Sequence, residues 1–214
     1  MERTADADEG RRSAASLDEA PRDGLRYLLR GLKATPAVVL SHRRDVLLWN
    51  PLGRALLAWH LTGPPEPPSG LASQAGSTSA GPPGDRLNLT RMLFRDPRTR
   101  LLYPHWAHET VLEAAELRQA ADSHPDDLTL TALIGELCAS DDHFATLWPH
   151  TAGQTRAFGV RHFLHPTAGP LELAYESIQS PDESGVSILV FSAEPDSPSE
   201  RALRELSAMA PDIR

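Results

Sequence analysis

Two short apolar runs joined by a charged turn lie near the start of the chain. Residues 36–41, PAVVLS, and residues 46–50, VLLWN, flank the turn HRRD. Apolar runs of this length bounded by polar residues are typical of antiparallel β-hairpins. Asn50 and Pro51 then favour a helix start, because Asn caps free backbone N–H groups and Pro fits the first helical position. The pattern predicts a hairpin followed directly by a helix over 51–60.

Helical spacing dominates two other regions. A short apolar helix is predicted over 24–32, and the stretch from 86 to 150 reads as a series of helices. The segment PDDLTLTALIGELCAS (125–140) shows the pattern well, because Leu130, Leu133 and Leu137 fall on one helical face after an Asp cap. These segments predict a helical layer.

After residue 155 the apolar residues recur at about every second position, as they do in β-strands. The runs 155–166, 171–178 and 186–193 are rich in β-formers, and the short turns between them predict an antiparallel meander. Leu171, Leu173 and Tyr175 alternate with polar or small residues, so one face of the sheet is buried. Ser197, Pro198 and Glu200 form a capping-box pattern that predicts a closing helix.

The element order therefore predicts an α+β fold. A five-stranded antiparallel sheet with helices inserted between its second and third strands, and a closing C-terminal helix, is a PAS-like plan. We expect one domain over 23–210, a disordered tail over 1–22, and a flexible Pro/Gly/Ser-rich insertion over 62–85. In a PAS-like domain the sheet and the inserted helices enclose one small-molecule pocket.

Composition narrows the possible functions. The formal net charge of −8 argues against direct contact with nucleic acid or anionic membranes. A single cysteine, Cys138, excludes an internal disulfide, and no segment resembles a signal peptide or membrane span. We therefore expect a cytoplasmic protein that contains no cofactor.

Neither catalytic nor metal-binding motifs stand out in the sequence. GxSxG, P-loop, GxGxxG and HExxH patterns are all missing. His162 and His165 are three apart on a predicted strand, which sends their rings to opposite faces, and His105 and His108 have no third ligand nearby in the sequence. We expect neither an enzyme nor a metal site.

Aromatic residues from several segments would surround the buried sheet face. Each one alone is explained by ordinary core packing. Arg156 and Arg161 open the meander, where either guanidinium would suit an acidic headgroup, and a solvated strand edge is the alternative for both.

Six phrases carry a resemblance to a known family. They are LWNPL (48–52), FRDP (94–97), LYPHW (102–106), FATLW (144–148), HPTAGPLELAYE (165–176) and AEPDSPS (193–199). In this order they resemble the MmyB-like transcription regulator ligand-binding domain, from about residue 24 to about residue 208. The resemblance implies a PAS-like fold, a hydrophobic pocket for fatty-acid-like ligands, and regulation of transcription. Family members usually carry a helix-turn-helix domain before this region, and the residues before Gly24 lack its pattern.

Two hypotheses for the function follow. The first is a sensing domain that binds a fatty acid or related apolar molecule between helices and sheet. The second is an interaction or homodimerisation module without a small ligand, favoured if the interior holds less than about 300 Å³. For the first hypothesis, Arg156 or Arg161 would hold the polar end, and the predicted pocket walls are Trp49, Phe94, Tyr103, Trp106, Trp148 and Tyr175.

Overall fold

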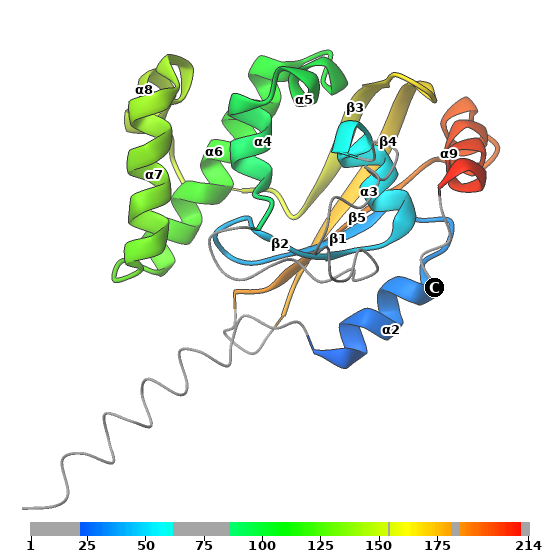
Figure 1. Cartoon of the computed structure of the whole chain (residues 1–214), viewed down its shortest axis with the longest axis horizontal. Coiled ribbons are helices and arrows are strands. Elements are labelled where there is room, and N and C mark those ends of the chain that lie inside the picture. Colours follow the sequence, from blue (N-terminus) through cyan, green and yellow to red (C-terminus); the bar gives the residue numbers. More distant parts are fainter. Residues whose placement is uncertain (1–21, 62–85, 154, 181–184, 211–214) are drawn as a thin grey trace, which may run out of the picture.

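A five-stranded antiparallel sheet forms the centre of the protein (Figure 1). The computed structural model describes residues 22–61, 86–153, 155–180 and 185–210. The strand order β2-β1-β5-β4-β3, with helices between β2 and β3, is the predicted PAS-like plan. The strands are β1 (Ala37–Leu40), β2 (Val46–Trp49), β3 (Phe158–His165), β4 (Gly169–Gln179) and β5 (Ser187–Ser192).

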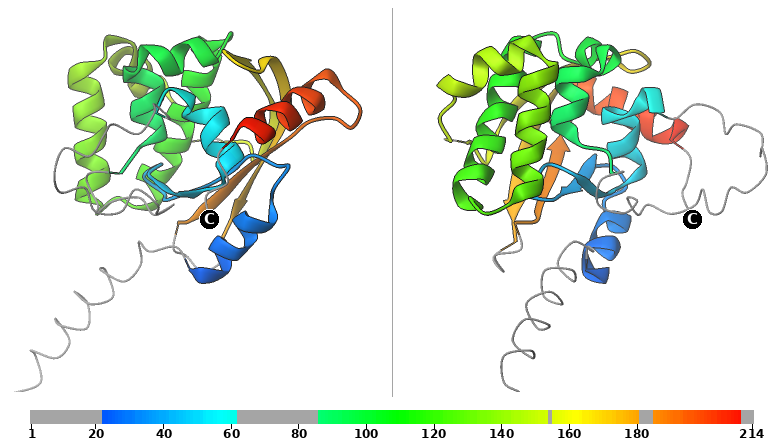
Figure 2. Two further views of the ribbon diagram at one scale, coloured as in Figure 1. Left: turned by 45° about the vertical axis from the view of Figure 1, so that its right-hand side comes forward. Right: turned by 60° about the vertical axis from the view of Figure 1, so that its left-hand side comes forward.

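Helices cover both faces of this sheet (Figures 1 and 2). The chain forms α2 before β1, most of the helices between β2 and β3, and α9 at the end. Their bounds are α2 (Asp23–Gly31), α3 (Pro51–Leu57), η1 (Trp59–Leu61), α4 (Leu89–Arg95), α5 (Pro97–Leu102), α6 (Trp106–Ser123), α7 (Leu128–Ser140), α8 (Asp142–Leu147), η2 (Trp148–His150) and α9 (Pro198–Met209).

The predicted link between the hairpin and the first inserted helix is confirmed. The Asn50 side chain caps α3 by accepting a 2.7 Å hydrogen bond from the Gly53 N–H, and Pro51 is the first helical residue. The helix ends earlier than predicted, because the backbone of Ala58 leaves the helical region and the chain continues into the short 3₁₀ turn η1.

Three apolar clusters hold the layers together. The largest lies between the inner sheet face and the helices α3, α4, α5 and α9, and includes Leu56, Met92, Leu173, Phe191 and Leu203. A second lies on the outer sheet face under α2. The third joins α4, α6, α7 and α8 to one another, so α7 and α8 form an outer layer that lies away from the sheet (Figure 1).

The meander and the closing helix also follow their sequence patterns. In β4, Leu171, Leu173 and Tyr175 are buried while the intervening residues are exposed. Ser197 caps α9 by accepting a bond from the Glu200 N–H. The Glu200 carboxylate accepts from the Asp196 N–H, one residue before the cap, so the reciprocal bond of the predicted box is shifted.

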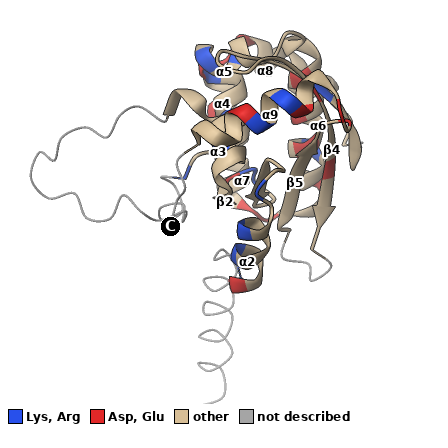
Figure 3. Ribbon diagram, turned by 90° about the vertical axis from the view of Figure 1, so that its right-hand side faces the viewer, with Lys and Arg blue, Asp and Glu red and all other residues tan. Residues whose placement is uncertain are grey.

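Acidic and basic residues are intermixed on the exposed surface of α9 (Figure 3). Arg204 pairs with Glu200 one turn earlier, at 3.2 Å. Within the described residues, no helix has the length and apolar character to cross a membrane. The predicted tail, apart from Arg22, and the predicted insertion over 62–85 lie outside the described residues.

Candidate functional site

Buried charged residues lie between the sheet and helix α6. Arg44, in the hairpin turn, directs its guanidinium at Glu113 of α6, and both N···O distances are 2.9 Å. Thr90 donates a 2.7 Å hydrogen bond to the same carboxylate. Arg44 is only 6% exposed and Glu113 only 4%. This two-point pair connects the hairpin to the helical layer.

The turn geometry explains why Arg44 reaches the interior. Arg44 adopts a left-handed backbone conformation with φ 69°, which few non-glycine residues do. The turn is closed by the Ser41 N–H bonding to the Asp45 carbonyl and by the Ser41 hydroxyl accepting from the Asp45 N–H. The strained position is thus held by the hairpin and by the ion pair to Glu113.

A second buried arginine lies on strand β3. Arg161 is 7% exposed, and its guanidinium stacks over the Tyr175 ring, 4.7 Å from the ring centroid. Its Nε lies 3.4 Å from Glu109 Oε2, without the geometry of a hydrogen bond. Arg161 is therefore less completely paired than Arg44.

A small cavity of about 20 Å³ lies next to Arg161. Two of its lining residues, Thr99 and Arg161, each have a buried polar atom, Oγ1 and Nε, without a hydrogen-bond partner among the described residues. Buried unpaired polar atoms are uncommon and indicate a place for a water molecule or a ligand group. The rest of the lining is Leu57, Leu89, Met92, Leu93, Tyr103, Glu109, Glu113 and Leu189.

The pKa shifts of the acidic residues follow their pairing. Burial raises the pKa of Glu109, and the nearby Arg161 only partly offsets this. Burial also acts to raise the pKa of Glu113, but the Arg44 guanidinium and the hydrogen bonds from Arg44 and Thr90 lower it overall. Glu113 is thus a fixed anion, while Glu109 is the carboxyl that more readily takes up a proton.

Burial also raises the pKa of the Tyr103 hydroxyl, so this residue is neutral. The Tyr103 side chain lines the cavity and its ring packs against Phe163, with centroids 5.4 Å apart. It therefore contributes an apolar ring with an uncharged polar tip.

The predicted pocket residues separate into three groups. Tyr103, Arg161 and Tyr175 lie together at the inner sheet face, and Trp49 belongs to the same apolar cluster without lining the cavity. Arg156 lies in the exposed segment before β3. The remaining three belong to the helical cluster: Phe94, Trp106 and Trp148.

Those three aromatic residues have partners of their own. The Trp106 indole donates a 2.9 Å hydrogen bond to the Leu93 carbonyl, and the Arg118 guanidinium stacks 3.7 Å above the Trp148 ring. Phe94 packs edge-on against Phe144, with centroids 5.0 Å apart. In this structure they bind α4, α6, α7 and α8 together.

Sequence analysis missed the acidic side of the site. Glu109, Glu113 and Glu116 follow one another at four and three residues in α6, which places them on one helical face. A row of carboxylates on a helix that faces a buried layer predicts basic partners, and this spacing is visible in the sequence. No sequence pattern marks Thr99 as a site residue, because only the tertiary structure shows its unpaired hydroxyl.

The described residues contain no group of three or more His, Cys, Asp or Glu side chains placed to hold a metal ion.

Fold and site together define a PAS-like domain with a buried arginine, Arg161, at the inner face of its sheet. Comparison with known families agrees: the model of the MmyB-like transcription regulator ligand binding domain matches residues 21–206 of the 214-residue chain. The protein belongs to this family. Its members are ligand-binding domains of transcription regulators, not an enzyme family. No curated protein matches the sequence.

Proposed function

We propose that the domain senses a hydrophobic carboxylic acid, such as a fatty acid, bound between the inner sheet face and helices α4 and α5. The observation that carries this proposal is that two buried atoms, Thr99 Oγ1 and Arg161 Nε, lack a hydrogen-bond partner among the described residues and lie beside a leucine-rich cavity. A carboxylate accepts from a guanidinium and a hydroxyl together. The leucines and Met92 would contact the alkyl chain.

The cavity must enlarge to take such a ligand. Its volume of about 20 Å³ suits roughly one water molecule, whereas ligand sites hold about 300–1,000 Å³. Each methylene that enters the interior contributes about 0.8 kcal/mol, so a ten-carbon chain offsets part of the cost of separating helices from the sheet. Ligand entry would then change the structure, which is what a sensor requires.

Binding of sodium decanoate to the purified chain tests this proposal. Isothermal calorimetry should show saturable binding, and Arg161→Gln should weaken it about ten- to a hundredfold, because a hydrogen bond to a charged group contributes about 1.5–3 kcal/mol. Arg156→Gln is the matched control, since Arg156 is exposed. Decan-1-ol, which lacks the carboxylate charge, should bind the Arg161→Gln and Arg156→Gln variants with equal affinity.

The proposal is wrong if decanoate fails to bind the unaltered chain, or if both arginine variants reduce binding equally. Far-ultraviolet circular dichroism shows whether Arg161→Gln is folded. Thr99→Val gives a second test, because it removes the unpaired hydroxyl and should weaken decanoate more than decanol.

The small interior supports a second candidate, an interaction or homodimerisation module without a small ligand. The volume of the interior cavity falls below that expected of a ligand site. In addition, helix α2 exposes two large side chains, Tyr27 at 68% and Leu28 at 47%. Sedimentation velocity of the unaltered chain and of Tyr27→Ser/Leu28→Ser separates the candidates. A dimer that the double variant abolishes, without decanoate binding, supports this alternative.

A further inference from the structure

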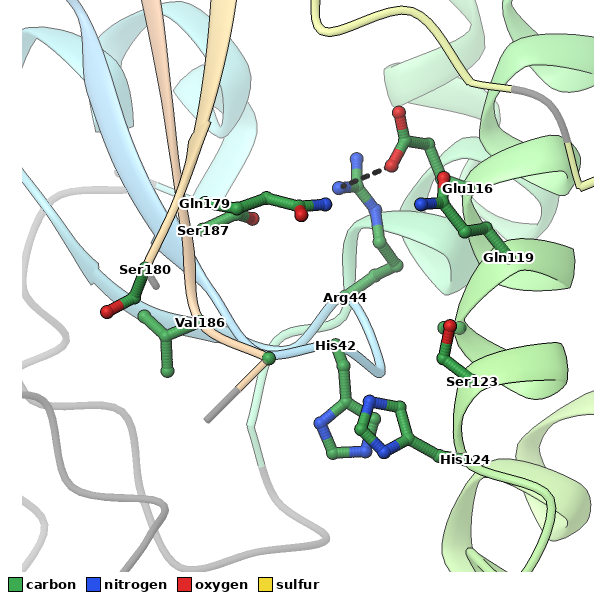
Figure 4. A pocket seen from close by; sticks show the side chains of 12 residues that line it. His42, Arg44, Glu116, Gln119, Ser123, His124, Gln179, Ser180, Val186 and Ser187 are labelled. Carbon is green, nitrogen blue, oxygen red and sulfur yellow. Dashed lines mark ion pairs between the residues drawn. The ribbon is translucent and has the colours of Figure 1, made fainter. Parts of the chain in front are cut away.

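A larger cavity, of about 560 Å³, lies on the other side of Arg44 from the apolar interior. Its walls come from helix α6, the hairpin turn, and the ends of β4 and β5 (Figure 4). Of the twelve lining residues that the structure describes, nine carry polar side chains. The volume is within the range of small-molecule sites, but the lining is unlike that of a fatty-acid pocket.

Helix α6 supplies one wall of this cavity from a single face. Glu116, Gln119 and Ser123 follow at spacings of three and four residues, so their side chains point the same way. In Figure 4 Glu116 and Gln119 project toward Gln179, which extends from the end of β4. The Gln119 carbonyl oxygen accepts from Thr155, which leaves its amide N–H groups for another partner.

Arg44 directs one terminal nitrogen toward the same space, where it forms only a long ion pair with Glu116 (Figure 4). Its Nε and one terminal nitrogen bond Glu113, whereas Nη1 lies 3.9 Å from Glu116 Oε2, beyond hydrogen-bond distance. Nη1 therefore has no hydrogen bond among the described residues and could donate one to a ligand oxygen. Burial raises the pKa of the Glu116 carboxyl above its ordinary value, although the neighbouring Arg44 acts to lower it.

Two histidine rings packed against each other at a tilt lie at the other end. His42 and His124 have ring centroids 4.2 Å apart, and His42 Nε2 is held by Asp127 at 2.7 Å. Burial and the neighbouring His42 lower the pKa of His124, which keeps its ring neutral at neutral pH. The two rings, one of them held by Asp127, therefore form a polar wall of the cavity.

The charges of the lining select among ligand classes. A strongly anionic ligand is disfavoured, because Glu113 already neutralises Arg44 and Glu116 stands beside it. The side-chain amides and hydroxyls of the lining both donate and accept, Arg44 donates and Glu116 accepts. This mixed set suits a neutral molecule rich in hydroxyl groups, which also donate and accept.

We propose that this cavity is a second ligand site, which binds a neutral polyhydroxylated molecule of mono- to disaccharide size, with Arg44, Glu116, Gln119 and Gln179 as its hydrogen-bonding residues. Because this site and the proposed acid site lie on opposite sides of the Arg44–Glu113 pair, they would be occupied independently. The proposal stands on the cavity and its lining alone and does not depend on fatty-acid binding.

Saturation-transfer NMR on the full chain tests the proposal with D-glucose, D-ribose, myo-inositol, maltose and trehalose as probes. At least one should show saturable transfer. Gln179→Ala and Glu116→Gln should each weaken that probe at least fivefold. Gln179 is exposed at a strand end, so its replacement leaves the fold intact. The control is Glu176→Gln, because Glu176 is exposed on the same strand and does not line the cavity; it should leave probe binding unchanged.

Three results overturn the proposal: no saturable transfer from any probe, transfer that the two cavity variants leave unchanged, or equally tight binding of inorganic phosphate at the same residues. Arg161→Gln separates this site from the proposed acid site. It should weaken decanoate binding and leave sugar binding unchanged. Loss of both would show that only one site exists.

Discussion

Arg44 and Glu113 show how one buried ion pair joins distant parts of the chain. They are 69 residues apart, and each is almost fully buried. A buried pair is weak evidence for added stability, because both charges lose hydration, but removing one partner leaves the other charge uncompensated. The pair therefore acts as a fixed connection between the hairpin and α6.

Replacing Glu113 with glutamine should reveal this dependence. We expect a loss of about 3–5 kcal/mol in the free energy of unfolding, because the Arg44 charge stays buried without its partner. Urea denaturation measures the loss. Glu136→Gln is the control: Glu136 pairs with Arg91 and Arg95 at the surface, so its loss should cost less than about 1 kcal/mol. Equal losses would contradict the argument.

Glu109 should give stability a distinct pH dependence. Burial raises its pKa above the ordinary 4.5. The folded state then holds the proton more tightly than the unfolded state, so stability decreases as the pH rises from about 4.5 through the raised pKa. Glu109→Gln removes this contribution. Urea denaturation from below 4.5 to neutral pH should show a steeper decrease for the unaltered chain, and parallel curves would refute the assignment.

Asn50 organises three elements at once. Its carbonyl oxygen accepts from the Gly53 and Ala37 N–H groups, and its amide donates to the Leu32 and Thr35 carbonyls. The end of α2, the start of β1 and the start of α3 are thus tied to one 3%-exposed side chain. This is more than the helix cap that the sequence predicts.

The Asn50→Ala variant should therefore cost more than the loss of a cap. We expect about 2–4 kcal/mol in the free energy of unfolding, since the cap is lost and buried partners are left unpaired. Ser197→Ala removes a cap that bonds Glu200 alone and should cost about 1 kcal/mol. Thermal and urea unfolding of both variants measure the difference, and similar losses would show that the additional bonds are unimportant.

Local signals explain which elements could be predicted from the sequence. The Asn50 cap, the alternation in β4 and the Ser197 cap each depend on residues a few positions apart. The pairing of β1 with β5, which joins the hairpin and the meander in one sheet, is a long-range contact that no such pattern shows. The site depends on contacts across the whole chain. The turn HRRD reads as an ordinary polar turn, and nothing local in it shows that Arg44 is buried.

The aromatic residues illustrate the same limit. Their number predicts a large apolar interior, but not how it divides. The structure places Phe94, Trp106 and Trp148 in the helical cluster and Tyr103 and Tyr175 at the sheet. That division depends on how α4 and α6 turn between the two layers, which the periodicity of each helix leaves open.

At the scale of the whole molecule, the layered architecture suggests how ligand entry would be transmitted. The small interior cavity lies between the sheet and α4–α5, and α4 also belongs to the cluster that holds α7 and α8. Helices packed in this way move as units, because a dense interior does not deform continuously. Separation of α4 and α5 from the sheet would therefore shift the outer helices as well.

Hydrogen exchange measured by mass spectrometry tests this coupling. In the free chain, the openings that admit an acid should allow exchange in α4 and α5, and bound decanoate should slow it there, because the filled site suppresses those openings. Helix α2 packs on the opposite sheet face and is the internal control, with no change expected. In the Arg161→Gln variant, the same decanoate concentration should no longer slow hydrogen exchange in α4 and α5. Equal slowing in α2 would instead indicate general stabilisation, and no change in α4 and α5 despite measured binding would place the ligand elsewhere.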